Sequence, residues 1–180
     1  MRKKILIGLG IVFLLFAGFI GYTLLTTKSH SPQDIAEISS GELSVKVVYC
    51  QPFKKGRKIF GTEEQEALLP YGKYWRLGAN DATEITFSKA VSFAGEPVPA
   101  GSYRMYAVPN ADDWEISLNS ALGEWGAWEP DYSLDVIKVN VPTSANSEAM
   151  EQLTIKLVDS ADQIDMNLMW DDVMVSVPIK

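Results

Sequence analysis

Apolar and polar residues alternate along most of the chain after residue 42. Val45, Val47 and Tyr49 share one face of the first such segment, and Lys46 and Val48 lie on the other. A period of two is typical of β-strands with one buried face. The pattern recurs at residues 85–87, 91–93, 103–108, 114–118, 137–141, 153–157, 164–170 and 173–179. The sequence therefore predicts an all-β fold, a single antiparallel β-sandwich or jelly-roll-like domain spanning residues 42–180.

Three local signals interrupt the alternation. Asp171 and Asp172 separate the last two segments, which predicts a hairpin with a two-residue turn. Thr62 precedes residues 63–69 with Gln65 at the capping-box position, so a short helical turn is expected there, ending at Pro70. Residues 147–152 are a second site for a helical turn.

The N-terminal segment has a different pattern. Residues 5–25 carry no charge, follow Arg2, Lys3 and Lys4, and would span about 31 Å as a helix, enough for a bilayer core. No small-residue cleavage site follows, which favours a transmembrane anchor over residues 1–28, although a cleaved signal peptide is the alternative. The basic N-terminal flank predicts a cytoplasmic N-terminus at the inner membrane and an extracytoplasmic, periplasmic domain. The polar residues 29–41 would link the two.

Charge restricts the partners of this domain. Four of the sixteen basic residues lie in or beside the apolar segment, which leaves twelve basic against twenty-three acidic residues and a net charge of −11. Such a charge argues against nucleic acid and against anionic surfaces as partners. Six of the twelve basic residues fall within residues 52–83, so this segment (the basic segment) is an exception within an acidic domain.

Several catalytic chemistries lack their residues. His30 is the only histidine and lies in the expected linker, so no catalytic triad and no histidine-ligated metal is expected in the domain. Cys50 lies in an alternating segment and is expected to be a buried core residue. Phosphate-binding glycine motifs are absent from the sequence. Asp159, Asp162 and Asp165 indicate an acidic turn rather than a calcium loop. We expect no cofactor and no metal.

The basic segment supplies most of the candidate ligand-binding residues. Arginine offers a fixed fork of donors for carboxylate or phosphate, and lysine offers a mobile positive charge. Two tryptophans in a glycine-rich loop add aromatic faces of the kind that stack on sugars, unless they close the core instead. The candidates are Arg57, Lys58, Tyr71, Lys73, Trp75, Arg76, Asn80, Trp125 and Trp128. The expected ligand is a small anionic or sugar-like molecule.

Residues 71–80 give the sharpest expectation. Neither alternating face of this stretch is uniformly apolar, so it is not an ordinary sandwich strand. Gly78 would allow a tight turn that returns Asn80 towards the same place. We therefore expect Arg76 or Lys73, together with Asn80, to be largely buried and hydrogen-bonded, with Arg76 either paired with a carboxylate or facing a cavity.

The same segment carries a family resemblance. Residues 56–61 (GRKIFG) and 69–83 (LPYGKYWRLGANDAT) resemble the signature of the bacterial domain of unknown function 2911, with further matches at residues 85–88, 99–103, 125–127, 135–136 and 153–154. The resemblance implies an exported all-β domain and supplies no substrate or catalytic residue. The acidic insert at residues 62–67 departs from the family pattern.

Two classes of function compete. A non-enzymatic ligand-binding or envelope-interaction module is favoured, because the histidine and cysteine chemistry of common active sites is missing. A hydrolase or isomerase acting on a small or sugar-like substrate would need carboxylate, tyrosine and lysine groups converging in one pocket. A purely structural envelope protein is the third interpretation, and the sequence identifies no protein partner.

Overall fold

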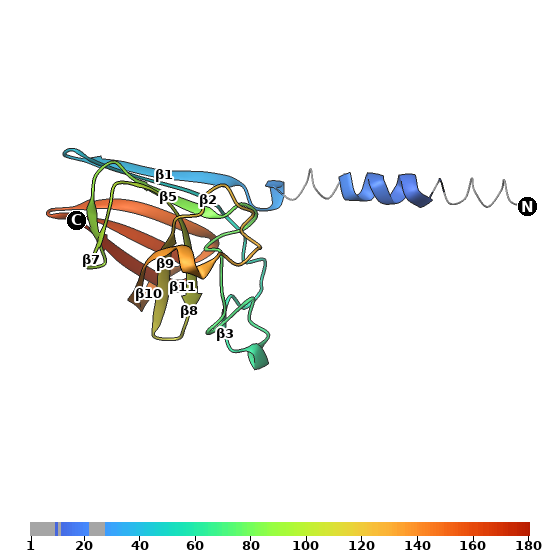
Figure 1. The fold of residues 1–180 in the computed structure, drawn as a ribbon. Coiled ribbons are helices and arrows are strands. Elements are labelled where there is room, and N and C mark those ends of the chain that lie inside the picture. The colour runs from blue at the N-terminus through green and yellow to red at the C-terminus, as the bar shows by residue number, and fades with distance from the viewer. Residues whose placement is uncertain (1–9, 11, 22–27) are drawn as a thin grey trace, which may run out of the picture.

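The computed structural model describes residues 10, 12–21 and 28–180, and nine of the strands in these residues form one large antiparallel sheet (Figure 1). The expected mostly-β antiparallel fold is confirmed. The strands are β1 (Gln33–Ser40), β2 (Leu43–Cys50), β3 (Phe60–Gly61), β4 (Leu69–Pro70), β5 (Thr83–Phe87), β6 (Val91–Phe93), β7 (Glu96–Val98), β8 (Gly101–Pro109), β9 (Asp113–Asn119), β10 (Asp135–Ser160) and β11 (Gln163–Ile179). Short 3-10 turns occupy η1 (Lys28–His30), η2 (Glu63–Gln65) and η3 (Tyr132–Leu134).

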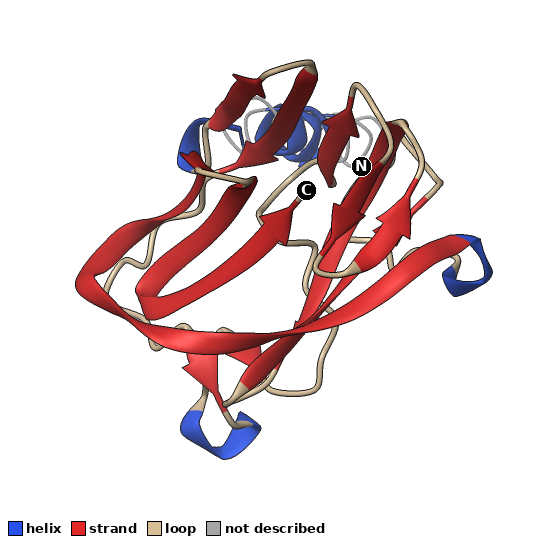
Figure 2. Ribbon diagram, turned by 90° about the vertical axis from the view of Figure 1, so that its left-hand side faces the viewer, coloured by secondary structure: helices blue, strands red, loops and turns tan. Residues whose placement is uncertain are grey.

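The sheet curls around its own core. Its strand order is β1-β2-β5-β8-β9-β10-β11-β6-β7. The long strand β10 pairs with β9 through residues 135–142 and with β11 beyond residue 143, so it carries the sheet around a corner (Figure 2). Backbone hydrogen bonds from Leu153 to Pro52 (3.1 Å) and from Lys54 to Glu151 (2.6 Å) then connect the chain beyond β2 to β10.

The alternating apolar residues form a single core between the facing parts of the sheet. Val47, Ile85, Met105 and Ile116 from the first strands are fully buried, as is Met166 of β11. Four aromatic rings fill one end of this core: Trp75 lies 5.9 Å from Phe60, 5.4 Å from Trp114 and 5.9 Å from Trp170. Burial of apolar side chains on both inner faces is what selects this register for each strand.

The chain before residue 42 differs from the expected linker. Gln33–Ser40 forms the edge strand β1, which pairs with β2 along its whole length. The linker expectation is therefore wrong for these residues. Most β1 side chains are exposed and only Ala36 and Ile38 pack against the core, so the strand lacks the clear alternation that identifies half-buried strands.

Two expectations within the last third are also wrong. Asp171 and Asp172 do not form a hairpin turn but lie inside β11, where Asp171 adopts a φ of 54° and Met150 pairs with it across a register shift. The hairpin turn comes earlier, at residues 161–162, because Ser160 pairs with Gln163. Residues 147–152 are part of β10, where the same register shifts form bulges instead of the suggested helical turn.

A helical turn follows Thr62 as expected, but it ends at Gln65, where Glu66 adopts a φ of 53°, and not at Pro70. The backbone N–H of Thr62 donates to Oε1 of Gln65 at 3.2 Å, and η2 follows.

Residues 12–21 are helical, while residues 5–9, 11 and 22–25 of the expected anchor lie outside the described residues. No helix in the described part of the chain has the length and apolar character needed to cross a membrane.

Candidate functional site

The segment at residues 71–80 is held against the sheet by its central residue. The backbone N–H and carbonyl of Trp75 pair with Ala107 of β8 at 2.8 and 2.9 Å. Trp75 is only 4% exposed and belongs to the aromatic end of the core. It is therefore mainly a core residue, and its neighbour Arg76 points to the opposite side of the extended backbone.

Two glycines fix the backbone around Arg76. A Cβ at Gly78 would lie 2.9 Å from the carbonyl oxygen of Cys50, so only glycine fits this close approach. A Cβ at Gly126 would lie 2.9 Å from Cδ of Arg76 and 3.1 Å from the backbone of Ala82. The tryptophan loop, residues 120–131, therefore packs directly on the stem of Arg76.

Asn80 is buried and hydrogen-bonded, as expected. Its side-chain Nδ2 donates to the backbone carbonyl of Ser31 at 3.3 Å, and its backbone carbonyl accepts from the N–H of Gly126 at 3.0 Å. Asn80 thus connects the N-terminal segment with the tryptophan loop. Its role in the site is structural, since both contacts are to backbone groups.

Arg76 lies between two cavities. Together with Leu69 and Trp75 it lines both a cavity of about 380 Å³ and a neighbouring one of about 250 Å³. Arg76 is half-buried and makes no hydrogen bond or ion pair with any described residue. Residues lining the larger cavity are His30, Ser31, Pro52, Phe53, Lys55, Arg57, Leu68, Leu69, Trp75, Arg76, Gly78, Ala79 and Trp170. The smaller is lined by Leu69, Tyr74, Trp75, Arg76, Gly126 and Ala127.

The charges in these two cavities contrast with the rest of the domain. Lys55, Arg57 and Arg76 line them, and no carboxylate does so among the described residues. Three other cavities each contain at least two acidic residues. Arg57 donates to the backbone carbonyls of Lys54 (2.9 Å) and Phe53 (2.5 Å), so its charge is positioned by neutral groups. We name this pair of cavities the Arg76 site.

The other candidates lie elsewhere. Lys58 and Tyr71 line a separate cavity with Asp171 and Asp172. Lys73 is 63% exposed and pairs with Glu63 of the acidic insert at 3.4 Å. Of the two alternatives, Arg76 or Lys73, the half-buried one is therefore Arg76. Trp125 and Trp128 are exposed, at 41% and 72%, and are not among the residues lining the Arg76 site.

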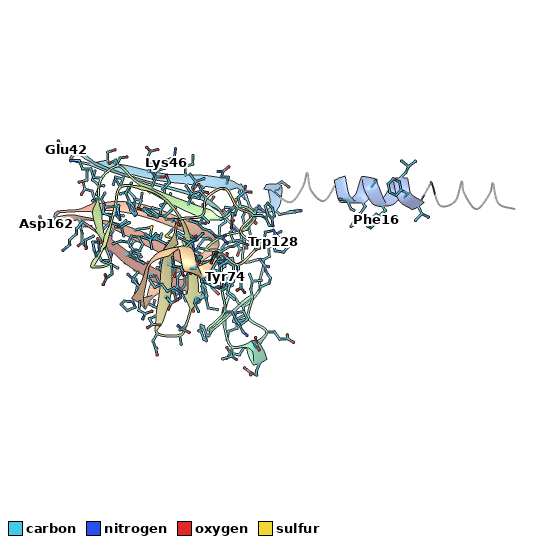
Figure 3. The ribbon with its side chains drawn as sticks, in the orientation of Figure 1. Phe16, Glu42, Lys46, Tyr74, Trp128 and Asp162 are labelled. Atoms are coloured by element: carbon cyan, nitrogen blue, oxygen red, sulfur yellow. The ribbon has the colours of Figure 1, made fainter. Side chains whose placement is uncertain are left out.

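A buried arginine that the sequence analysis did not single out anchors the tryptophan loop. Arg104 of β8 is 0% exposed, and its guanidinium donates to Oε2 of Glu124 (2.7 Å) and to the carbonyl of Trp128 (2.6 Å). It also donates to the hydroxyl of Tyr74 at 2.6 Å. Tyr74 and Trp128 accordingly lie together in Figure 3. The alternation predicts that Arg104 lies on the outer face of β8, but it does not predict that a loop covers this face.

The tyrosines near this network are weak acids. Burial raises the pKa of Tyr74, and the neighbouring Arg104 opposes the rise. Burial raises the pKa of Tyr106 as well, and its hydroxyl donates to Asp135 at 2.7 Å. For Tyr132, burial and the carboxylate of Glu129 raise the pKa to about 12. At neutral pH these hydroxyls stay protonated, so they donate hydrogen bonds and do not act as bases.

Metal binding finds no support in the part of the chain that the structure describes. No three His, Cys, Asp or Glu residues there are grouped to hold a metal ion.

His30, in contrast, contributes to the larger cavity instead of lying in a free linker. Sequence reasoning missed it, along with Lys55 and Leu68, because tertiary contacts bring these residues together. The pairing of β1 with β2 places His30, the contact with Glu151 of β10 places Lys55, and the hydrogen bond from the N–H of Leu68 to the carbonyl of Lys58 places Leu68.

Fold and site together define an all-β domain that carries a cation-lined, partly apolar cavity at one end of its core. Residues 31–179 match the family model described as Protein of unknown function (DUF2911), and the chain belongs to this family. The resemblance drawn from the basic segment is thereby confirmed. No curated protein and no solved structure matches the chain.

Proposed function

We propose that the domain is a non-enzymatic module that binds a small anionic ligand at the Arg76 site. The observation that carries the proposal is the half-buried guanidinium of Arg76, which has no hydrogen-bond or ion-pair partner among the described residues. Two further cations line the same site, and none of the described residues that line it is a carboxylate. In a domain with a net charge of −11, a cavity that no acidic side chain of the described residues lines is an exception that favours an anion.

The geometry fits a ligand with one carboxylate or phosphate group. A half-buried guanidinium offers paired donors to such a group, and partial desolvation strengthens the charge-assisted hydrogen bonds. The larger cavity, at about 380 Å³, falls within the usual range for small-molecule sites. Its mixture of apolar wall and few polar groups is also typical of such sites.

Substitution of Arg76 tests this proposal. Arg76→Gln removes the charge while keeping a polar side chain of similar reach, and we expect binding of inorganic phosphate or short carboxylates to weaken by at least about tenfold, which is about 1.4 kcal/mol. Isothermal titration of the full chain gives the affinities. Lys156→Gln is the matched control, because Lys156 is exposed on β10 and lines neither cavity.

Two outcomes would count against the module. Equal weakening by Lys156→Gln would assign the effect to net charge alone. A lack of binding by every carboxylate, phosphate and sugar tested would favour the purely structural role.

An enzymatic function is the second candidate, and a different cavity favours it. A cavity of about 390 Å³ contains Glu115 and Glu129 together with Lys138 and three tyrosines, Tyr74, Tyr106 and Tyr132. This is the convergence of carboxylate, tyrosine and lysine that a hydrolase or isomerase would need. Chromogenic glycosides and esters test it: turnover that disappears in both Glu115→Gln and Glu129→Gln would support the enzyme, and no turnover would remove it.

The finer description of the fold and its location belongs to the same proposal. The pairing of the chain beyond β2 with β10 supports a β-sandwich rather than an open sheet. The uncharged residues 5–25 and the preceding basic residues support a single-pass anchor in the inner membrane with the domain outside it. The ligand would then be met in the periplasm.

A further inference from the structure

The larger cavity of the Arg76 site lies next to the N-terminal segment. His30 and Ser31 line it, and the hydrogen bond from Asn80 to the carbonyl of Ser31 fixes this part of the chain to the domain. Four residues lie between Leu25, where the apolar run ends, and His30, and the five steps from one to the other can span at most about 18 Å. With residues 5–25 in a bilayer, the cavity would lie close to the lipid headgroups.

One wall of the cavity is more apolar than a small hydrophilic anion requires. Phe53, Leu68 and Leu69 contribute to it, and so do the stacked rings of Trp75 and Trp170. Leu68 is 39% exposed, so the structure leaves an apolar side chain at the cavity without an internal partner that covers it. A bound apolar group would remove this surface from water, and that burial would add to the affinity.

The exposed Trp128 lies at the same end of the domain, and Trp125 pairs with Asp81, the residue after Asn80. Figure 3 shows Trp128 at the end where the chain leaves towards residues 12–21, and Glu42 and Asp162 at the opposite end. Trp128 is 72% exposed and Trp125 is 41% exposed. Tryptophan side chains favour the membrane–water interface, because the ring is apolar while its N–H still needs a polar partner.

We propose that the ligand of the Arg76 site is an anionic amphiphile drawn from the bilayer surface. Its acidic group pairs with Arg76 and Arg57, and its apolar part covers Leu68 and the face of Trp75. This inference rests on the proposed anion-binding function and names the class of ligand. Location, apolar wall and cationic edge coincide in one cavity, and a soluble hydrophilic anion would use only the last of the three.

Paired ligands separate the two levels of the proposal. The full chain, held in phosphatidylcholine nanodiscs, is titrated with dihexanoyl phosphatidic acid and with glycerol phosphate, its headgroup without the acyl chains. Tryptophan fluorescence follows binding, since Trp75 and Trp170 line the cavity. We expect the amphiphile to bind at least about tenfold more tightly, because each methylene removed from water strengthens binding about fourfold.

Substitutions assign the gain to the cavity wall. Leu68→Ser should weaken the amphiphile and leave glycerol phosphate unchanged, whereas Arg76→Gln should weaken both. Leu122→Ser is the matched control, because Leu122 is similarly exposed at 46% but lines neither cavity. Nanodiscs containing phosphatidylglycerol should compete with the added amphiphile if the bilayer supplies the ligand.

Each alternative result would contradict one defined part of the proposal. Equal affinity for the two ligands, or no effect of Leu68→Ser, would remove the amphiphile and leave an anion site. Absence of competition by phosphatidylglycerol would remove the bilayer as the source. No binding of either ligand would remove the proposed function itself, and this inference with it.

Discussion

Arg104 shows how much one buried side chain contributes to the arrangement of the site. Its guanidinium joins β8 to Glu124, Trp128 and Tyr74 of two different segments, at 2.6–2.7 Å. Its Nε is buried and has no hydrogen-bond partner among the described residues, which is a cost that the other contacts must offset. Removing the side chain leaves the Tyr74 hydroxyl without the hydrogen bond from Arg104 and removes two of the hydrogen bonds that hold the tryptophan loop.

Substitution by methionine isolates this contribution. We expect Arg104→Met to lower the free energy of unfolding by about 2–3 kcal/mol, at the lower end for a buried ion pair because Glu124 remains partly exposed to water. Chemical unfolding of the full chain in neutral detergent measures the loss. Lys138→Met is the control: its ion pairs with Glu115 and Asp135 are solvent-exposed on the lysine side, so the expected change is below about 1 kcal/mol.

Tyr49 predicts an alkaline limit to stability. Its hydroxyl accepts from the N–H of Ile155 at 2.9 Å, and burial raises the pKa of Tyr49 from 10.0 to about 12. The unfolded chain therefore loses this proton at lower pH than the folded one, so the stabilisation is fully present below pH 10 and is lost as the pH rises towards about 12.

The pH dependence can be assigned by one substitution. Allowing for solvent screening, the loss between pH 10 and pH 12 should be about 1–2 kcal/mol. Tyr49→Phe should lower stability at neutral pH and give a shallower decline above pH 10, as measured by thermal unfolding across the series. An unchanged slope would show that other tyrosines control this range.

For single residues, the sequence predicted which types of side chain form the site better than it predicted where each side chain lies. The close approach at Gly78 was predictable, because a glycine requirement is a local property. Arg76 lines a cavity, one of the two outcomes expected for it, and Asn80 is buried and hydrogen-bonded, but Asn80 does not line that cavity with it. Lys73 turned outwards to Glu63, a residue of the insert, and Trp75 turned into the core. The orientations of these two side chains depend on tertiary neighbours from η2, β8 and β11. Alternation along one segment does not specify those neighbours.

The edge strand β1 gives the clearest test among the elements. Ile38 pairs with Val45 and packs against the core, while Ile35 on the same strand is 52% exposed. If β1 is an integral strand, Ile38→Ser should destabilise the domain by about 1–2 kcal/mol and Ile35→Ser by less than about 0.5 kcal/mol. Thermal unfolding compares the two, and equal small effects would return residues 33–40 to the status of a linker.

Strands with one buried face were predictable because the period of two is imposed by the pleat itself. The bends were not. Residues 147–152 and Asp171 lie in bulged parts of β10 and β11, where β10 has more residues than β11 between successive paired positions. These additional residues break the alternation without ending the strand. The two adjacent aspartates, Asp171 and Asp172, can mark either a hairpin turn or a bend within one strand. The pairing of Met150 with Asp171 shows that they mark a bend.

For the whole molecule, the net charge and the location of the Arg76 site both bear on how the domain would be oriented at a membrane. A domain carrying −11 would be repelled by an anionic bilayer, yet the Arg76 site and the exposed tryptophans lie at the end where the chain leads to the apolar segment. Over distances beyond the screening length of about 8 Å the net charge counts little, while the three cations act at contact. A tether would therefore hold the domain with its basic end towards the lipid and its acidic bulk away from it.

The proposed anchor predicts a definite fractionation. The full chain should stay in the membrane pellet after carbonate extraction, keep its N-terminal methionine-containing peptide in mass spectrometry, and expose the domain to protease added to spheroplasts but not to intact inverted vesicles. Replacing Arg2, Lys3 and Lys4 with glutamine should reduce the fraction in this orientation, because those charges are what retains the N-terminus inside. Release of a shorter chain into the periplasm would instead identify residues 1–28 as a cleaved signal peptide, and would separate the Arg76 site from the bilayer that the amphiphile proposal requires.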